Sequence, residues 1–449
     1  MAKSNVDRFI KNPRKVLFTL AIPIAIGMLI QAMYEFADTA FVGRLGADAI
    51  AALTFSFPLF FILIAFNVGL SAGMGSRISR FLGEKSKKEA ENAAFHGLLI
   101  SIALAIISFL SVTFVLRNIF VIFGASGQTL ELSLDYMSII LLGVFFIFPE
   151  YALSSIFQAE GDTKTIMYIQ IASLLLNIIL DPILIYGAGL GVRGAAIATF
   201  IAFLFSFLLY IYYIHKKSYL KIKWSSFKYS SRIIWDILKV GAPATLMVFI
   251  LSFYVIFLNK FMAHFGTNYI AAFGLASQLE SIAVIPIVAF SSAILTLIGM
   301  FYGAKKHNLL RDTSVYGLKA VALLTSIIGV IFFALSPFLF RIFTDDKIIL
   351  GLSASYMRID VLTFPLMGIV TTVSRIMQGF GDGSPGLVLN IVRIFVVALP
   401  LAYLFVFGLG FGFLSVAWAM VSGGAIASII SIVWLNLKLK RIDKKYSLI

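Results

Sequence analysis

Two aspartates interrupt apolar stretches of this sequence and are the strongest candidates for chemistry. Asp38 lies in YEFADTAFVG, and Asp181 lies in LLLNIILDPILIYG, where Asn177 precedes it by four residues and so shares its helix face. Pro182 removes a backbone donor and frees the carbonyl of Ile178. Two carboxylates, an amide oxygen and a free carbonyl form an all-oxygen environment. Such a site can hold Na⁺ or a proton and does not suit a soft transition metal.

Five further acids, Glu35 among them, lie inside apolar stretches, where a charge costs about 2.5–3.5 kcal/mol at the centre of a spanning helix. Asp135 and Asp360 lie within about two turns of a predicted helix end, so contact with water accounts for them. Glu280, in ASQLESIAV, suits either a hydrogen bond within its half of the chain or a role in a cavity. Glu150, in FIFPEYALSS, is flanked by apolar and aromatic residues, which favours a function for it.

The elements that must position these acids are membrane-spanning helices. The chain has 449 residues, of which 60% are hydrophobic and 13% charged, and its apolar stretches exceed the roughly 20 residues that a spanning helix needs. Transmembrane β-barrels alternate apolar and polar residues, so they are excluded. The predicted fold class is therefore an all-α integral membrane protein. The twelve predicted spans lie near 16–43, 47–76, 92–116, 130–157, 166–187, 194–214, 234–263, 268–301, 316–341, 352–377, 386–408 and 412–436.

The net charge of +15 reflects membrane topology, because most of the 36 Lys and Arg residues lie at the two termini and in alternate loops. The positive-inside rule then places both termini in the cytoplasm, with anionic lipid as neighbour and no support for nucleic-acid binding. The basic N-terminus is followed by an apolar run that is too long for a removed signal, so we interpret it as the first span. The chain has no cysteine, which excludes disulfides and thiolate metal sites.

The sequence repeats itself at an offset of 220 residues, which lays RLGADAIAAL on HFGTNYIAAF and QAEGD on QGFGD. Each half holds six spans and so enters the membrane in the same orientation, as two bundles related by a pseudo-twofold along the membrane normal. We predict an N-terminal lobe over 1–214, a cytoplasmic basic linker over 215–232 and a C-terminal lobe over 233–449. This architecture is typical of alternating access.

The repeat also serves as an internal control on the acids. The position opposite Asp38 is Leu258, and the segment 393–400, opposite Asn177 to Asp181, has no acid. Acids that held the fold together would be needed in both halves, so their restriction to one half favours a function. Glu35 shares a helix face with Asp38, and the sequence leaves its role open.

The motifs together resemble the multidrug and toxic compound extrusion (MATE) family over essentially the whole chain. They are PIAIGMLIQAMYEFAD at 23–38, the QxxGD loop in both halves and NxxxDP at 177–182. Within that family the chain is similar to the archaeal and DinF-like branch. The second-lobe acids of the NorM-like branch are missing from the seventh and tenth spans, which leaves Glu280 as the second-lobe candidate.

The resemblance implies a role for several residues at matching positions. The coupling ion, H⁺ or Na⁺, would be bound by Asp38, Asn177, Asp181 and Thr199. The substrate cavity would be lined by Gln31, Tyr34 and Tyr136, to which we add Glu150 because of its apolar surroundings, and the first helix would bend at Pro23.

These observations predict a secondary active antiporter of the cell membrane and not an enzyme. It would export amphipathic organic cations in exchange for H⁺ or Na⁺, with no cofactor beyond the coupling ion, and we expect a monomer. An acidic cavity lined by Tyr, Phe and Met suits such cations.

Three other functions can be weighed against this one. A flippase for a lipid-linked saccharide would use the same fold and cationic cavity residues, for which Arg375 and Arg393 are the candidates. An intramembrane aspartyl protease shares the short GFGD motif at 379–382, but its partner motifs are not found. An ion channel would need a filter-like loop or a charged ring, and neither occurs.

Overall fold

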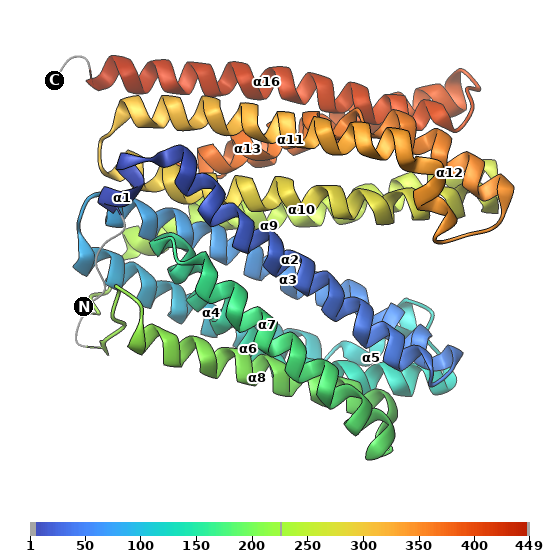
Figure 1. Cartoon of the computed structure of the whole chain (residues 1–449). Coiled ribbons are helices and arrows are strands. Elements are labelled where there is room, and N and C mark those ends of the chain that lie inside the picture. The colour runs from blue at the N-terminus through green and yellow to red at the C-terminus, as the bar shows by residue number, and fades with distance from the viewer. Residues whose placement is uncertain (1–5, 225–226, 447–449) are drawn as a thin grey trace. The chain divides into compact units, whose positions relative to one another are not determined.

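The computed structural model describes residues 6–224 and 227–446, apart from the side chains of Val6, Glu35, Lys445 and Tyr446. The open question of what Glu35 does therefore lies outside the described residues. Regular structure in the described part is helical throughout, as the prediction of an all-α protein requires (Figure 1).

Eleven helices of the described residues are long and apolar enough to cross a membrane, and the pair α12 and α13, bent by 48°, makes a twelfth span. The first half contains α1 (Val6–Lys11), α2 (Pro13–Gly43), α3 (Ala47–Gly83), α4 (Lys87–Thr113), α5 (Leu116–Ile122), α6 (Gly127–Glu160), α7 (Thr163–Pro182), the π-helical turn η1 (Ile183–Gly187) and α8 (Gly191–Lys216). The second half contains α9 (Ser231–Phe265), α10 (Thr267–Gly303), α11 (His307–Arg341), α12 (Lys347–Asp360), α13 (Thr363–Gly379), α14 (Ser384–Ile391), η3 (Val392–Ala398), α15 (Leu399–Tyr403), η4 (Leu404–Gly408) and α16 (Leu414–Tyr446). The predicted fold class is confirmed.

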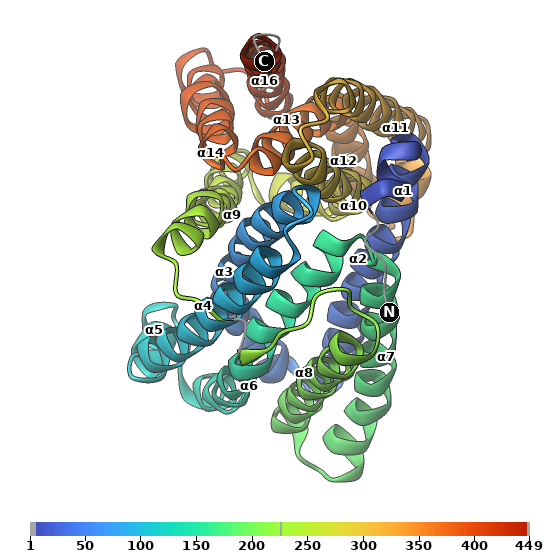
Figure 2. The same ribbon diagram turned by 90° about the vertical axis from the view of Figure 1, so that its left-hand side faces the viewer.

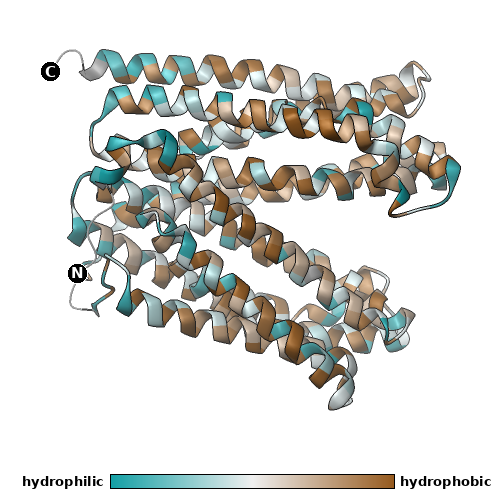
Figure 3. Ribbon diagram, viewed as in Figure 1, coloured by the Kyte–Doolittle hydropathy of each residue, from teal (hydrophilic) through white to brown (hydrophobic). Residues whose placement is uncertain are grey.

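Hydropathy is distributed along these helices as a membrane requires. Their central turns are apolar, and polar residues gather towards their ends and in the connecting loops (Figure 3). Large apolar side chains such as Phe114, Ile179 and Phe338 are more than half exposed. Because lipid is as apolar as a protein core, such side chains need no cover from other helices.

The backbone repeats at the offset that the sequence shows. The helices α3 and α10 are both 37 residues long, and their first residues, Ala47 and Thr267, lie 220 positions apart. Lys85 and Lys305, separated by the same offset, are the non-glycine residues with positive φ, at 57° and 55°. Such backbone angles are uncommon in residues with a side chain, so the same special turn has been kept in both halves.

The chain divides into two compact units, each with its own hydrophobic core. Unit 1 contains Ile22–Thr245, and unit 2 contains Arg8–Ala21 and the chain from Leu246 onward. The helices α2 and α9 therefore each contribute to both units, and each changes unit beside a proline, Pro23 or Pro243. The two units are defined by contacts within each unit, whereas the predicted lobes, 1–214 and 233–449, are defined by the sequence repeat. The lobe boundaries therefore stay a prediction.

The start of α9 is held in unit 1 by small residues of α3. Gly69 and Gly73 lie one helical turn apart, and a Cβ on Gly73 would collide with the carbonyl of Ile237. Small residues at this spacing let two membrane helices approach closely. Arg77 adds an ion pair to Asp236 over 3.2 Å, with both side chains largely buried.

The start of α2 is held in unit 2 by contacts of a different kind. Arg14 pairs with Asp312 over 3.6 Å and lies 4.9 Å from the centre of the Tyr316 ring. Phe18 meets Phe290 edge to face, with ring centres 5.1 Å apart. These contacts fix the first turns of the helix before it reaches Pro23.

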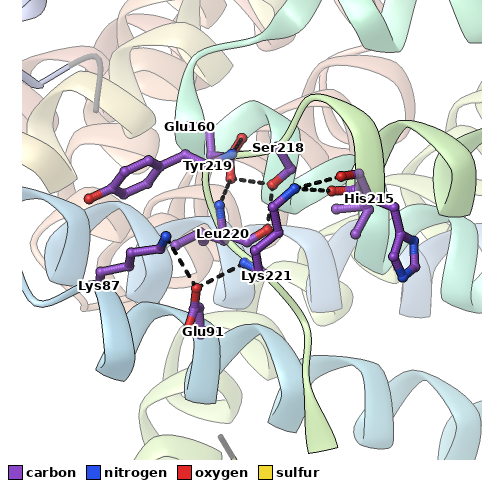
Figure 4. A network of polar contacts seen from close by, with 9 residues as sticks. Lys87, Glu91, Glu160, His215, Ser218, Tyr219, Leu220 and Lys221 are labelled. Carbon is purple, nitrogen blue, oxygen red and sulfur yellow. Dashed lines mark hydrogen bonds and ion pairs between the residues drawn. The ribbon is translucent and has the colours of Figure 1, made fainter. Parts of the chain in front are cut away.

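The segment between α8 and α9 is bound to one end of unit 1, which Figure 2 views end-on. Glu160 accepts hydrogen bonds from the Ser218 hydroxyl over 2.6 Å and from the Leu220 amide over 2.8 Å (Figure 4). Glu91 accepts one from the Lys221 amide over 2.9 Å. The basic linker is thus anchored through its backbone, in the part of it that the structure describes.

Candidate functional site

Asp38 lies on α2, about one turn before the helix ends at Gly43. The segment after Pro23 contains no further proline, so α2 continues without a break to the acid. The side chain is 7% exposed, and Tyr136 of α6 donates a hydrogen bond to Asp38 Oδ2 over 3.4 Å. Asp38 is therefore a buried carboxylate with one weak hydroxyl partner.

Asp181 and Asn177 lie one turn apart on α7 and are both fully buried. Asn177 Nδ2 donates to Asp181 Oδ1 over 3.4 Å, which fixes the two side chains on the same face, as the spacing predicts. The helix α7 ends at Pro182, and the π-helical turn η1 follows at once. A π-helical turn interrupts the regular backbone pattern and is frequent at functional sites.

Five buried oxygen atoms at this place have no hydrogen-bond partner among the described residues. One is the hydroxyl of Tyr34, and the other four belong to the predicted ion ligands: Asp38 Oδ1, Asn177 Oδ1, Asp181 Oδ2 and Thr199 Oγ1. Asp38 and Asp181 are close enough to interact electrostatically, and Asp38 shares a cavity with Thr199. Buried polar atoms are rarely left without a partner, so five together indicate a ligand.

The donor set limits which ligand fits. No group of three or more His, Cys, Asp or Glu that could hold a metal is present in the described part of the chain. Two carboxylates with neutral oxygens from an amide and a hydroxyl carry at most two negative charges. This combination suits a monovalent cation or a proton, and it lacks the soft ligands that transition metals prefer.

A cavity of about 50 Å³, the Asp38 chamber, opens beside the aspartate in unit 1. Gln31, Tyr34, Tyr136 and Thr199 line it together with Asp38. Aromatic rings of α3 and α8 form much of the remaining wall. With Ser56 of α3, the chamber thus combines one acid, five polar side chains and an aromatic surface.

Glu150 lies apart from this group, in a second cavity of about 100 Å³, the Glu150 chamber. The Ser206 hydroxyl donates to Glu150 Oε1 over 2.7 Å. Gln31 and Tyr34 line both chambers, whereas Tyr136 lines only the Asp38 chamber. The cavity that the sequence suggests as one is therefore divided in two in this structure.

The remaining acids have different surroundings. Asp135 pairs with Arg193 over 2.6 Å at a partly exposed position, in accord with the expected contact with water. The same expectation for Asp360 is wrong, because its side chain is only 4% exposed at the bend after α12. Glu280 lies in unit 2, where it interacts electrostatically with Arg393 and Asp360.

Several residues of the Glu150 chamber were not predicted. Ser206 follows Thr199 by seven residues, two helical turns, so a polar stripe on α8 could have indicated it. Gln170 and Ser173 of α7 also line the chamber. These residues could not be recognised as cavity residues from the sequence, because serine and glutamine occur in many of its spans.

The alternatives lose support at the residues that suggested them. Asp382 of the GFGD motif accepts a hydrogen bond from the Ser384 amide over 3.3 Å, as an ordinary turn residue does. Arg375, a cation considered for a flippase, donates to Gln378 over 3.0 Å, and Arg393 interacts with Glu280. Both arginines are thus already engaged within unit 2.

Repeated six-span halves with buried acids beside a cavity define a polytopic membrane transporter, not an enzyme. Comparison with known proteins then names the family. The MatE family model matches residues 23–183 and 243–404, one segment in each half, so the chain belongs to the MATE family of transporters. The predicted resemblance is confirmed, while the archaeal and DinF-like branch stays a prediction.

Individual relatives agree with this assignment. The multidrug export protein MepA of Staphylococcus aureus strain NCTC 8325 is 28% identical over 421 residues, which cover 92% of each chain. A MATE crystal structure in the bent conformation matches with a TM-score of 0.95 at 29% identity over the full length of both chains. A MOP superfamily transporter from Pyrococcus furiosus Vc1 matches with a TM-score of 0.93 at 29% identity, over 99% of each chain.

Proposed function

We propose that this protein is a secondary active antiporter that exports amphipathic organic cations in exchange for H⁺ or Na⁺. The observation that carries the proposal is the set of four unpartnered oxygens on Asp38, Asn177, Asp181 and Thr199, buried together in unit 1. The similarity to a protein named as a multidrug exporter supports the choice of cargo.

The proposed cycle begins with the uptake of the coupling ion at Asp38 and Asp181. Two neighbouring carboxylates in a medium of low dielectric favour uptake, because each otherwise stays charged beside the other. With the pair neutralised, α2 repacks at Pro23, the cavity contracts and the bound compound leaves. An elementary charge that crosses roughly 100 mV releases about 2.3 kcal/mol, which is enough to drive useful export.

The proposed cargo follows from the lining of the cavity. Tyr34, Tyr136 and the phenylalanine rings around them offer aromatic faces, which attract organic cations. Gln31 adds a polar contact that can orient the cargo. With both termini in the cytoplasm of a cell-membrane protein, export runs outward against the inward movement of the ion.

The proposal is tested by replacing Asp38 with asparagine. Purified protein in proteoliposomes is given a proton gradient or a sodium gradient separately, and efflux of a fluorescent organic cation is followed. We expect the Asp38→Asn variant to lose about a hundredfold in gradient-driven efflux, since an amide of the same shape cannot take up the ion's charge. Undiminished efflux in this variant would contradict the proposal.

A matched control removes a carboxylate from the same unit outside the site. Asp48 is an exposed residue of α3 that accepts a hydrogen bond from Thr129 over 2.6 Å. The Asp48→Asn variant is expected to transport as the unmodified protein does. A loss in both variants would point to a general effect of charge and not to the ion site.

A further inference from the structure

Glu150 is a carboxylate within a membrane span that has no cation to pair with. The helix that carries it, α6, contains no Lys or Arg between Gly127 and Glu160, and neither does α2 from Ile22 to Gly43. None of the ion pairs among the described residues includes Glu150. A charged group in a membrane interior needs a partner, a water-filled cavity or a proton.

The hydrogen bond to Glu150 leaves one of its oxygens available. Ser206 donates to Oε1 over 2.7 Å, and no hydrogen bond to Oε2 is present among the described residues. The side chain lines the Glu150 chamber, so Oε2 can receive a proton from the water in it. A serine hydroxyl both donates and accepts, and it can support either protonation state of the carboxyl group.

The Glu150 chamber suits water and small ions. Its volume of about 100 Å³ is far below the roughly 300–1,000 Å³ of pockets that hold drug-sized compounds. Gln170, Ser173 and Ser154 line it with polar atoms, so water inside the chamber finds hydrogen-bond partners. The chamber in this structure therefore has room for water molecules and is too small for a whole drug molecule.

The two chambers adjoin each other. Gln31, Tyr34, Phe60, Ile64 and Phe203 line both, so a single layer of side chains separates them. Gln31 and Tyr34 precede Asp38 on α2, on the side away from the helix end at Gly43. The Glu150 chamber thus continues the path from the Asp38 chamber deeper into unit 1.

We propose that Glu150 is a proton station between the Asp38 and Asp181 pair and the opposite end of unit 1. The inference rests on the proposed function, with the proton as the coupling ion. A proton leaves a carboxyl group of the aspartate pair, moves through the water of the adjoining chambers and binds Oε2 of Glu150. It then passes to water beyond the chamber, and the aspartate and glutamate carboxylates are anionic again.

Glu150 is the carboxylate among the residues that line its chamber. The titratable side chains that face it are Tyr34 of α2, Tyr151 of α6 and Tyr210 of α8. The helices α3 and α7 contribute only apolar and neutral polar side chains to the chamber. Glu150 is thus the carboxyl group that can take up and release a proton in this chamber.

The test compares net efflux with exchange in the Glu150→Gln variant. Proteoliposomes measure efflux of a tetraphenylphosphonium probe under a proton gradient, and exchange of labelled for unlabelled probe without a gradient. Exchange needs no release of the proton, whereas net efflux needs it in each cycle. We expect net efflux to fall about a hundredfold and exchange to stay within about twofold of the unmodified protein.

Other outcomes overturn the inference. Net efflux that persists in the variant shows that the proton does not pass through Glu150. Exchange that falls in parallel with efflux shows that Glu150 binds the positive charge of the cargo instead. The Glu150→Asp variant separates the second result from misfolding, because it keeps the carboxyl group and is expected to keep both activities with an altered pH profile.

Two comparisons complete the design. Glu131→Gln makes the same change in α6 at an exposed residue that pairs with Arg117, and is expected to change neither activity. Asp38→Asn separates the inference from the proposed function. If Asp38→Asn loses gradient-driven efflux and Glu150→Gln keeps it, only the inference fails. If Asp38→Asn keeps it, the proposed ion site fails whatever Glu150 does.

Discussion

At the proposed ion site, Thr199 would contribute one neutral oxygen, which Na⁺ needs as a ligand and a proton does not. Its hydroxyl has no hydrogen-bond partner in the described part of the chain, although its side chain is only 3% exposed. A sodium ion needs several oxygen ligands, whereas a proton needs only a carboxylate. The two ions therefore depend on Thr199 to different degrees.

Replacing Thr199 with valine removes the hydroxyl and keeps the shape of the side chain. We expect the half-saturating sodium concentration to rise about tenfold, which corresponds to about 1.4 kcal/mol for one lost ligand. Proton-driven efflux is expected to change little. Measurement of efflux against sodium concentration and against pH checks this, and an equal loss with both ions would show that Thr199 acts through the packing of α8.

The two acids of the proposed ion site can be found in the sequence because acids are rare in apolar spans. Asp38 and Asp181 stand out there, and the repeat separates them from the scaffold, since Leu258 takes the place of Asp38. In the structure Leu258 is 3% exposed and packs in the core of unit 2, so this position of the fold needs no acid. The partners of Glu150 could not be predicted, because neutral polar residues such as Ser206 are common in spans and their contacts depend on helix packing.

At the scale of the elements, the contact between α3 and α9 positions the first helix of the second half of the chain. Gly69 meets Gly241 and Thr245, and Gly73 meets Ile237, so two glycines of α3 face successive turns of α9. The linker reaches this contact already bound to Glu160 and Glu91. The first turns of α9 are thus positioned in unit 1 both by their packing against α3 and by the bound linker that precedes them.

The Gly73→Val variant tests this contact. A valine side chain at this position overlaps the carbonyl of Ile237, and backbone cannot move aside as a flexible side chain can. We expect a loss of about 2 kcal/mol in the free energy of unfolding, seen as a melting temperature lowered by about 2 °C in detergent. Gly274→Ala is the control, because an added Cβ there meets no atom within 4 Å. An unchanged melting temperature for Gly73→Val would show that the contact contributes little.

The spans themselves could be predicted closely, because their length and hydropathy are set by the membrane. The bend of 48° between α12 and α13 was not foreseen and lies where Asp360 ends the first helix of the pair. That segment has the hydropathy of a single span, and the local sign of a second helix is Pro365 in the first turn of α13, where a proline is tolerated. The start of α2 belongs to unit 2 and the start of α9 to unit 1. This was also not predicted, because it depends on contacts between residues far apart in the sequence.

At the scale of the whole molecule, the distribution of charge predicts an orientation in the membrane that the fold alone does not. Basic residues gather at the termini and in the loops on the same side of the repeat, including the linker between α8 and α9. The positive-inside rule then places the linker in the cytoplasm and the loop between α11 and α12 outside. The chain has no cysteine, so single cysteines can report each side without removing others first.

Lys223 in the linker and Asp345 in the loop before α12 are both exposed and suit this measurement. In intact cells, a membrane-impermeant maleimide is expected to label the Asp345→Cys variant and not the Lys223→Cys variant. Both should be labelled once the membrane is made permeable, which shows that each thiol is reactive. If intact cells instead label only the Lys223→Cys variant, the protein has the opposite orientation in the membrane. The direction of transport would stay the same, because in an antiporter the inward ion gradient drives the cargo outward whichever way the protein faces.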